Sequence, residues 1–450
     1  MKHAEFVSDT DGRRTESDLY NTRKRTYRAW LFVILLASIL AIFTVMYVDL
    51  YQSTPGRITI IAGSEQSIDL NVPLSGTIVS RRVQADPGVG EGENAVSVSA
   101  GTMHVDFSAP VRVYADKPSA YVANVKVFGI IPFKQIRIDV IDNLKLIPAG
   151  TSIGIYMKTT GIYVVGCATF ESGTGTEISP CEYLLRAGDV ILAADNVPVS
   201  DNQTFIQYVE ESEGRPIFLD VLRKEEEITV KVAAQQNADG IYRLGIWIKD
   251  SAQGIGTLTY VSADCSYGAL GHGISDKDTA ELIPIASGSL FQTQIVNVRK
   301  GVKGEPGEMT GLIRYTGSHK IGTIEGNTEH GIYGVMEDTM MDRFDREPLS
   351  IATSNEMKCG PATILCTLED EVCEYEIEIE KINHNQDVSR GLTIHVTDQE
   401  LLELAGGIIQ GMSGSPIIQD GRLIGAVTHV LVNDPTRGYG IFIEEMLKQP

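Results

Sequence analysis

Residues 411–416 place a serine between two glycines, in the order Gly-Met-Ser-Gly-Ser-Pro, and an apolar run follows them. This pattern predicts a sharp turn that exposes the hydroxyl group of Ser413. A serine alone is a weak nucleophile, so it needs a base and hydrogen-bond donors for an oxyanion. We expect the backbone N–H groups of Gly411 and Ser413 to be those donors. The alternative interpretation is a glycine- and serine-rich hairpin without chemistry.

The base for such a serine is expected to be a histidine, and His272 is the strongest candidate. It lies in the glycine-rich segment Gly268–Asp276, shortly after a strand pattern, and its small neighbours leave an imidazole accessible. His395 and His429 lie in strand patterns, where each is alternatively a histidine of the core. A triad is assembled in space, so the long separation of His272 from Ser413 is no obstacle. The eight histidines are His3, His104, His272, His319, His330, His384, His395 and His429.

The carboxylate that would orient the base is expected at Asp398, shortly before the nucleophile. Asp398 follows Thr397, and Glu400 lies three residues after that threonine, which is a capping-box pattern for the start of a helix. An acidic residue at this position also stabilises the positive end of a helix. Orientation of the base and helix capping are both compatible with the spacing.

An uncharged apolar run, Ala29–Val48, precedes all of these residues. As a helix it would span about 30 Å, which is enough to cross the core of a bilayer. Basic residues crowd the segment before it, whereas Asp49 and a single Arg57 follow it. The positive-inside rule therefore predicts a cytoplasmic N-terminus and an exported chain after about Leu50. A cleaved signal peptide and a buried core helix are the alternatives.

Composition narrows the classes of function and partner. The 450 residues are enough for several domains, and the formal net charge of −21 argues against nucleic acid as a partner.

None of the six cysteines forms a Cys-x-x-Cys pair, so the spacing argues against zinc. We also expect no other metal and no cofactor. Export would permit disulfides, for example between Cys167 and Cys181 or within the last three cysteines, and inert core cysteines are the alternative. The cysteines are Cys167, Cys181, Cys265, Cys359, Cys366 and Cys373.

The remaining chain is predicted to be mainly β. Residues 1–28 form a polar cytoplasmic tail, 29–48 the anchor, and 51–148 a small β module. The short strands expected in this module are Ile58–Ile61, Val96–Ser99, Val111–Tyr114 and Ala123–Phe128. Residues 236–450 again contain strand patterns. In Cys373–Glu380, glutamates alternate with apolar residues, which is typical of a strand with one solvated face and not of a metal site.

Residues 149–235 contain short strands, one helical pattern at Asn202–Glu211 and a closing hairpin. This order, together with the string Arg-Ala-Gly-Asp-Val-Ile-Leu at 186–192, resembles a PDZ domain of the kind found in exported bacterial proteases. Such domains receive a peptide as an added strand and hold its terminal carboxylate with backbone N–H groups of a glycine-containing loop. The resemblance assigns that loop to Ser152, Ile153, Gly154 and Ile155. A tight turn that needs Gly154 for its backbone alone is the alternative.

Several separated strings resemble the stage IV sporulation protein B peptidase family of endospore-forming bacteria. They are residues 411–430, Ala269–Asp276, Gly304–Glu308 and His330–Gly334, and they occur in the family's order behind an anchor and a PDZ-like domain. The resemblance implies a chymotrypsin-like double β-barrel in which His272, Asp398 and Ser413 are base, orienter and nucleophile. Met412 stands where trypsin-type enzymes have an aspartate, so the ion pair of those zymogens is not expected.

The resemblance also implies a role in sporulation signalling. The chain is expected to act between forespore and mother cell, where it would cleave a regulator of a membrane metalloprotease that processes a sigma factor. It is further expected to cleave itself, with new N-termini between about Tyr51 and Ala149. The candidate segments are Tyr51–Gly56 and Gln84–Asn94, which are poor in strand signals. A PDZ-bearing membrane scaffold with an inactive peptidase fold is the alternative from another class.

Overall fold

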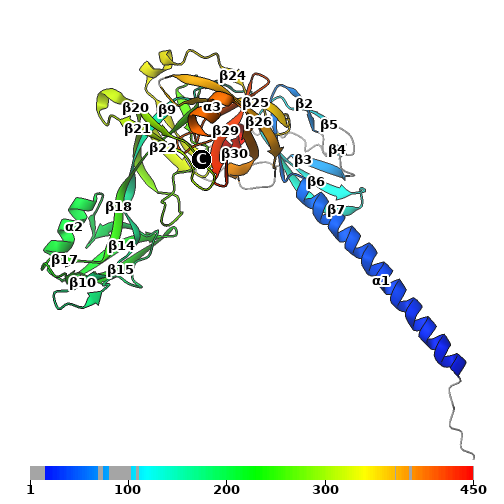
Figure 1. Cartoon of the computed structure of the whole chain (residues 1–450), viewed down its shortest axis with the longest axis horizontal. Helices are drawn as coiled ribbons and strands as arrows, with labels where there is room; N and C mark the ends of the chain where they lie inside the picture. The colour runs from blue at the N-terminus through cyan, green and yellow to red at the C-terminus, as the bar shows by residue number, and fades with distance from the viewer. Residues whose placement is uncertain are drawn as a thin grey trace, which may run out of the picture.

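The structure is a computed structural model, and it describes residues 16–68, 74–80, 103–107, 111–369, 371–384 and 388–448. The predicted strand at 96–99 and the predicted processing segment at 84–94 lie outside these residues. The described chain is mainly β, as the sequence predicts. A long N-terminal helix leads to a small β module, two β-barrels and a projecting lobe (Figure 1).

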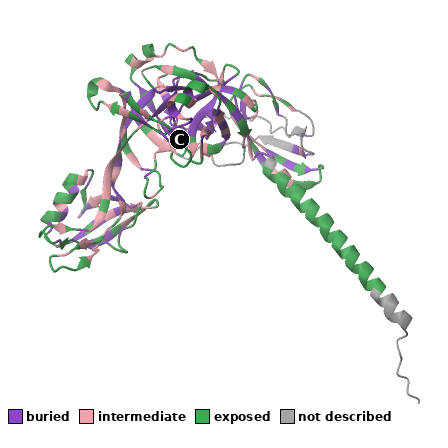
Figure 2. Ribbon diagram, in the orientation of Figure 1, coloured by how far each residue is buried: buried purple, intermediate pink, exposed green. Residues whose placement is uncertain are grey.

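The N-terminal helix α1 (Glu16–Ser53) extends away from the body of the molecule (Figure 1). Its stretch Lys24–Gln52 is long and apolar enough to cross a membrane, and the side chains of residues 24–49 are exposed (Figure 2). The 29 residues of this stretch span about 44 Å as a helix. The predicted anchor at 29–48 lies inside it. One apolar helix of this length can therefore anchor the protein in a membrane.

The small β module begins directly after α1. The ring of Phe133 packs edge-on against Tyr47 and Tyr51, with ring centroids 5.4 and 5.6 Å apart, and Lys134 Nζ donates to the carbonyl of Thr54 at 2.6 Å. One sheet has the strand order β1-β7-β6-β3-β4, and β2 pairs with β5. The bounds are β1 (Arg57–Ile61), β2 (Glu65–Ile68), β3 (Leu74–Ser80), β4 (Met103–Asp106), β5 (Val111–Tyr114), β6 (Ser119–Val127) and β7 (Ile131–Ile141).

Six strands close the first barrel. They follow the order β9-β18-β19-β23-β22-β20, and pairing of β20 with β9 completes the ring. Apolar side chains such as Ile153, Met157 and Leu290 fill its interior. The bounds are β9 (Ser152–Cys167), β18 (Ile246–Val261), β19 (Ser266–Ala269), β20 (Ile285–Arg299), β22 (Lys320–Thr328) and β23 (Gly331–Met336), with β8 (Lys145–Pro148), β21 (Glu308–Ile313), η1 (Gly317–His319), η2 (Asp338–Arg343) and β24 (Leu349–Ser350) attached.

The second barrel closes in the order β25-β26-β27-β30-β29-β28. When the strands of each barrel are numbered along the chain, both rings have the same order, so the two barrels share one topology. In β26, Tyr375, Ile377 and Ile379 are buried while the glutamates between them are exposed, as the alternation predicts. The bounds are β25 (Gly360–Thr367), β26 (Val372–Ile382), η3 (Val388–Arg390), β27 (Leu392–Val396), α3 (Gln399–Ala405), β28 (Pro416–Gln419), β29 (Arg422–Leu431), β30 (Asp434–Phe442) and α4 (Ile443–Met446).

The α2 lobe, residues 160–249, projects from the first barrel on two of that barrel's own strands (Figure 1). The predicted helix and closing hairpin are present as α2, β14 and β15. Phe205 and Val209 of α2 pack into a separate core with Ile217 and Leu219 of β14. The bounds are β10 (Phe170–Glu171), β11 (Glu177–Ile178), β12 (Val190–Ala194), β13 (Val197–Pro198), α2 (Asn202–Glu211), β14 (Pro216–Arg223), β15 (Glu226–Ala233), β16 (Gln235–Gln236) and β17 (Tyr242–Arg243).

The lobe is therefore an insertion in the first barrel, which differs from the predicted boundaries of 149–235 and 236–450. The first half of β9 pairs with β18 and β20 inside the barrel, and its second half pairs with β18 and β12 inside the lobe. Strand patterns do not reveal this, because one continuous strand serves two cores.

All six cysteines are free, although Cys167 Sγ lies 3.5 Å from the carbonyl oxygen of Cys181 and Cys366 faces Cys373 across β25 and β26.

Candidate active site

Ser413 lies on a tight turn that precedes β28 of the second barrel. Gly411 and Gly414 have φ angles of +105° and +97°, which other residues rarely adopt. A Cβ atom at Gly414 would lie 2.0 Å from the carbonyl oxygen of Thr257 in the first barrel, so only glycine permits this approach. Ser415 is fully buried, whereas Ser413 is partly exposed. Of these two serines, Ser413 is therefore the one whose hydroxyl a substrate can reach.

Strand β18 of the first barrel forms hydrogen bonds to the backbone carbonyls of the serine turn. The hydroxyl of Thr257 donates to the carbonyl of Gly411 at 2.8 Å, and the Thr257 amide donates to the carbonyl of Ser413 at 2.9 Å. Two residues further on, the hydroxyl of Thr259 donates to the carbonyl of Gly414 at 2.8 Å. Both threonines are completely buried.

The amides of Gly411 and Ser413 donate to no other backbone group within the described chain. The peptide groups around them are nevertheless fixed, because the carbonyl of Gln410 accepts from the Met309 amide at 2.9 Å and that of Met412 accepts from the Ser415 amide at 2.9 Å. Fixed donors without an internal partner are what an oxyanion hole requires. Both amides lie in this turn, and their role as oxyanion donors stays a prediction.

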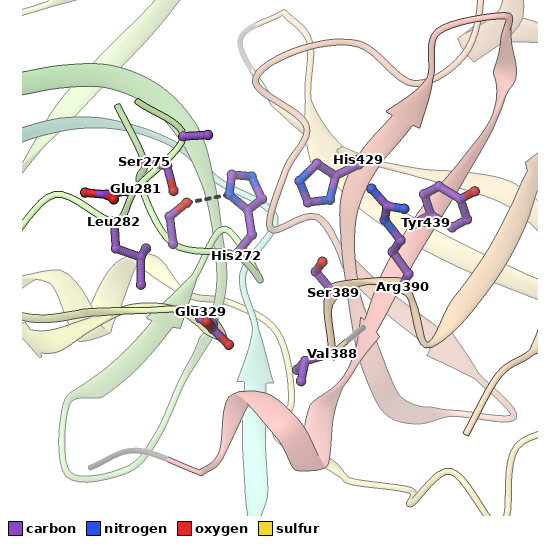
Figure 3. A pocket seen from close by; sticks show the side chains of 12 residues that line it. His272, Ser275, Glu281, Leu282, Glu329, Val388, Ser389, Arg390, His429 and Tyr439 are labelled. Atoms are coloured by element: carbon purple, nitrogen blue, oxygen red, sulfur yellow. Dashed lines mark hydrogen bonds between the residues drawn. The ribbon is translucent and has the colours of Figure 1, made fainter. Parts of the chain in front are cut away.

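His272 follows β19 at the mouth of the cleft between the barrels, opposite His429 of β29 (Figure 3). The two imidazole rings are 4.8 Å apart between centroids and tilted by 33°. The Nδ1 atom of His272 lies 2.9 Å from the carbonyl oxygen of Gly273. This contact fixes the orientation of the imidazole ring. Both histidines line one cavity, together with Glu281, Glu329 and other residues of both barrels.

Burial keeps both imidazoles neutral at neutral pH. It lowers the pKa of His272 below the ordinary 6.5, although the Gly273 carbonyl acts in the opposite direction. The pKa of His429 falls to about 4, because of burial and of the nearby cationic forms of His272 and Arg390. A neutral imidazole is the form that accepts a proton, so His272 is in the state of a general base.

The hydroxyl of Ser413 donates to the carbonyl of Thr428 at 2.6 Å. Thr428 directly precedes His429, and a Cβ atom at Gly271 would lie 3.1 Å from the Thr428 methyl group. The serine and the His272 loop therefore meet at the same point of β29. For proton transfer, the hydroxyl must turn away from the Thr428 carbonyl and towards His272.

Asp398 occupies a different place from the one that the triad prediction requires. It is the N-cap of α3, where its carboxylate accepts from the Leu401 amide at 3.0 Å and from the Glu376 amide at 3.2 Å. The Nδ1 atom of His272, which an orienting carboxylate would contact, lies against the Gly273 carbonyl instead. The structure therefore gives Asp398 the capping role and not that of orienter. His395, the other alternative base, lies on β27 with its Nδ1 3.9 Å from Glu380.

The predicted peptide-binding loop at Ser152, Ile153, Gly154 and Ile155 is wrong. These residues are the first four of β9; all four pair with β18, and the last three also pair with β20 on the other edge. Ile153 and Ile155 are buried in the first barrel, and a Cβ at Gly154 would lie 2.5 Å from Ile313. The glycine is needed for close packing inside a barrel strand, and the four residues form no loop.

The α2 lobe has a groove elsewhere, between α2 and the first residues of β18. Phe205 and Ile206 of the helix line one wall, and Leu244 to Ile248 line the other. In this stretch the described pairing of β18 is with β9 alone, so its second edge faces the groove. Gly245, with φ +69°, turns the chain at the entrance. The signal in the sequence is Leu244-Gly245-Ile246, an apolar pair around a glycine just before a strand.

Residues 240–447 match the family model described as SpoIVB peptidase S55. No curated protein matches the chain. The inactive form of the Rv3671c protease has 16% identity and a TM-score of 0.25, over 43% of this chain and 82% of that one. The active form, from M. tuberculosis, has 15% identity and a TM-score of 0.27, over 44% and 73%.

Proposed function

Residues 240–447 belong to the SpoIVB peptidase S55 family, so the chain is a serine peptidase, and on this premise we propose that Ser413 and His272 carry its chemistry. The observation that supports this proposal is the serine turn itself. It combines a partly exposed hydroxyl, two amides that donate to no other backbone group of the described residues, and an adjoining loop that carries a neutral imidazole.

In the proposed mechanism, His272 takes the proton of Ser413 as the hydroxyl attacks a peptide carbonyl. The amides of Gly411 and Ser413 then hold the negative oxygen of the tetrahedral intermediate. His272 returns the proton to the leaving amine, and water hydrolyses the acyl-enzyme by the same steps. The Gly273 carbonyl at Nδ1 keeps the proton on that nitrogen, which leaves Nε2 free to act as the base.

We further propose a membrane-anchored enzyme with its N-terminus in the cytoplasm and its peptidase domain outside. The basic segment before the apolar helix supports this orientation. The family name supports a role in sporulation. The resemblance in sequence to this family suggests a regulator of a membrane metalloprotease as the protein substrate. The α2 lobe would act as a PDZ-like module, and a peptide would join the open edge of β18 as an extra strand in the groove beside α2.

Self-processing gives the test of this proposal. We expect shorter forms released from the membrane, with new N-termini between about Tyr51 and Ala149, in cells that express the wild-type chain. These forms should be absent from Ser413→Ala, and they should persist in Ser415→Ala, whose serine is buried. N-terminal sequencing of the released species identifies the sites. If the same fragments remain in Ser413→Ala, another protease makes them, and an inactive scaffold becomes the better account.

A further inference from the structure

The loop that carries His272 to β20, residues 272–284, forms one side of the catalytic cavity. Ser275, Glu281 and Leu282 line that cavity (Figure 3), and so does Ala280. The loop lies outside the strands of the barrel, and Asn327 of β22 binds its two ends, through the Ile274 amide at 2.8 Å and the carbonyls of Ile274 and Ile283 at 2.9 and 3.0 Å. The segment between these ends, residues 275–282, needs contacts of its own to stay in place.

Asp276 is the centre of this loop. Its side chain is only 1% exposed, and it accepts hydrogen bonds from the amides of Asp278 at 3.0 Å and Thr279 at 3.2 Å. Lys249 of β18 donates to the same carboxylate at 2.5 Å. A buried carboxylate is costly without a charged partner, so the lysine and the loop are bound to each other.

A second bond joins the loop to the same place. The hydroxyl groups of Tyr163 and Thr279 lie 2.6 Å apart. Tyr163 of β9 and Lys249 of β18 are register partners, so the two bonds start from one cross-strand pair. In addition, a Cβ atom at Gly188 of the lobe would lie 2.2 Å from the carboxylate of Glu281, so the loop packs against the lobe itself.

This cross-strand pair lies where the α2 lobe leaves the barrel. The same strand β18 carries Thr257, which holds the serine turn, about 26 Å further along at 3.3 Å per residue. Strand β18 therefore contacts the His272 loop near its first residues and the serine turn near its last residues. The ion pair of Lys249 with Asp276 is the link that completes this arrangement.

We propose that Asp276 and Lys249 are positioning residues for the catalytic base. Their ion pair binds the His272 loop to strands β9 and β18 at the point where the α2 lobe leaves the barrel. The proposal rests on the role of His272 given above. It makes the placement of the lobe a determinant of the geometry of the active site. A bound peptide that displaced the α2 lobe relative to the first barrel would change kcat through this ion pair.

Asp278 provides a matched control. Its carboxylate lies 3.5 Å from the same lysine, but it is 64% exposed. In the anchored full-length chain, Asp276→Asn keeps an acceptor for the two loop amides and removes only the charge. We expect kcat per titrated active site to fall about tenfold to a hundredfold, with KM nearly unchanged, as for a misplaced base. Asp278→Asn should leave both constants near wild type, and Lys249→Arg should retain more activity than Lys249→Met.

A second readout does not depend on activity. In protein with 13C-labelled histidine, Asp276→Asn should shift or broaden the ring resonance of His272, assigned with His272→Asn, while Asp278→Asn leaves it in place. An unchanged resonance, or full kcat in Asp276→Asn, overturns the proposal while the peptidase assignment stands. If the wild-type chain lacks peptidase activity, the proposed function fails, and the His272 resonance still decides the positioning role.

Discussion

Replacement of Thr257 by valine removes one buried hydroxyl and keeps the shape of the side chain. The lost bond, 2.8 Å long, joins this completely buried side chain to the carbonyl of Gly411, a residue that is partly exposed. A buried carbonyl that loses its partner costs about 1–3 kcal/mol. The peptide group of Gly411 adjoins both amides of the proposed oxyanion hole, so the loss falls on the catalytic turn.

The expected loss of kcat can be estimated from the proposed role of the serine turn as the oxyanion hole. Deletion of one oxyanion donor costs about 10²–10³ in kcat in a serine protease. Thr257→Val loosens the donors without deleting them, so we expect kcat to fall about tenfold to a hundredfold, which is about 1.4–2.8 kcal/mol of transition-state stabilisation. KM should change much less, because the donors act on the oxyanion and not on the bound substrate.

Thr259→Val is the matched comparison. Its hydroxyl forms an equally short bond from an equally buried position, but to the carbonyl of Gly414, beyond both donor amides. Steady-state kinetics on a peptide ester, with active sites titrated, and thermal unfolding should be measured for both variants. The two should lose similar stability, while Thr257→Val loses more kcat. Equal kcat losses, or full activity in Thr257→Val, would refute the proposed role of the turn.

Four further outcomes are expected. Asp398→Ala should cost about 0.5–2 kcal/mol of unfolding free energy through the lost helix cap, with little change in kcat per folded molecule, whereas Asp398→Asn should be nearly neutral in both assays. Gly414→Ala should abolish activity and lower the melting temperature, because its Cβ would clash with the Thr257 carbonyl. In a pH profile, kcat/KM should rise with pH through a pKa below 6.5, because burial lowers the pKa of His272 and only the neutral ring accepts a proton. The double variant His272→Ala/Ser413→Ala should be no less active than either single variant, since the two residues act as a unit.

Local sequence patterns were sufficient for the parts of the fold that depend on local structure. Helix α2 is predicted with its observed bounds, and the alternating glutamates of β26 face solvent as expected. The serine turn is also visible in sequence, because glycine is the residue that permits its positive φ angles. These features need no knowledge of distant contacts.

Features that depend on distant contacts could not be predicted in this way. Thr257 and Thr259 look like ordinary strand residues, and only the meeting of the two barrels makes them the supports of the serine turn. Gly154 resembles a loop glycine in sequence, whereas the structure uses it for close packing against Ile313. Asp398 satisfied the spacing of a triad and of a helix cap equally, and only its contacts separate the two.

The most direct test of the central claim is covalent labelling of the folded chain by a fluorophosphonate probe, followed by mass spectrometry of the modified peptide. The account predicts modification of the wild-type chain at Ser413, loss of labelling in Ser413→Ala and strongly slowed labelling in His272→Ala. Ser415→Ala should be labelled like the wild type. Absence of labelling in correctly folded wild-type protein, or modification at Ser415 in place of Ser413, would contradict the assignment of the nucleophile.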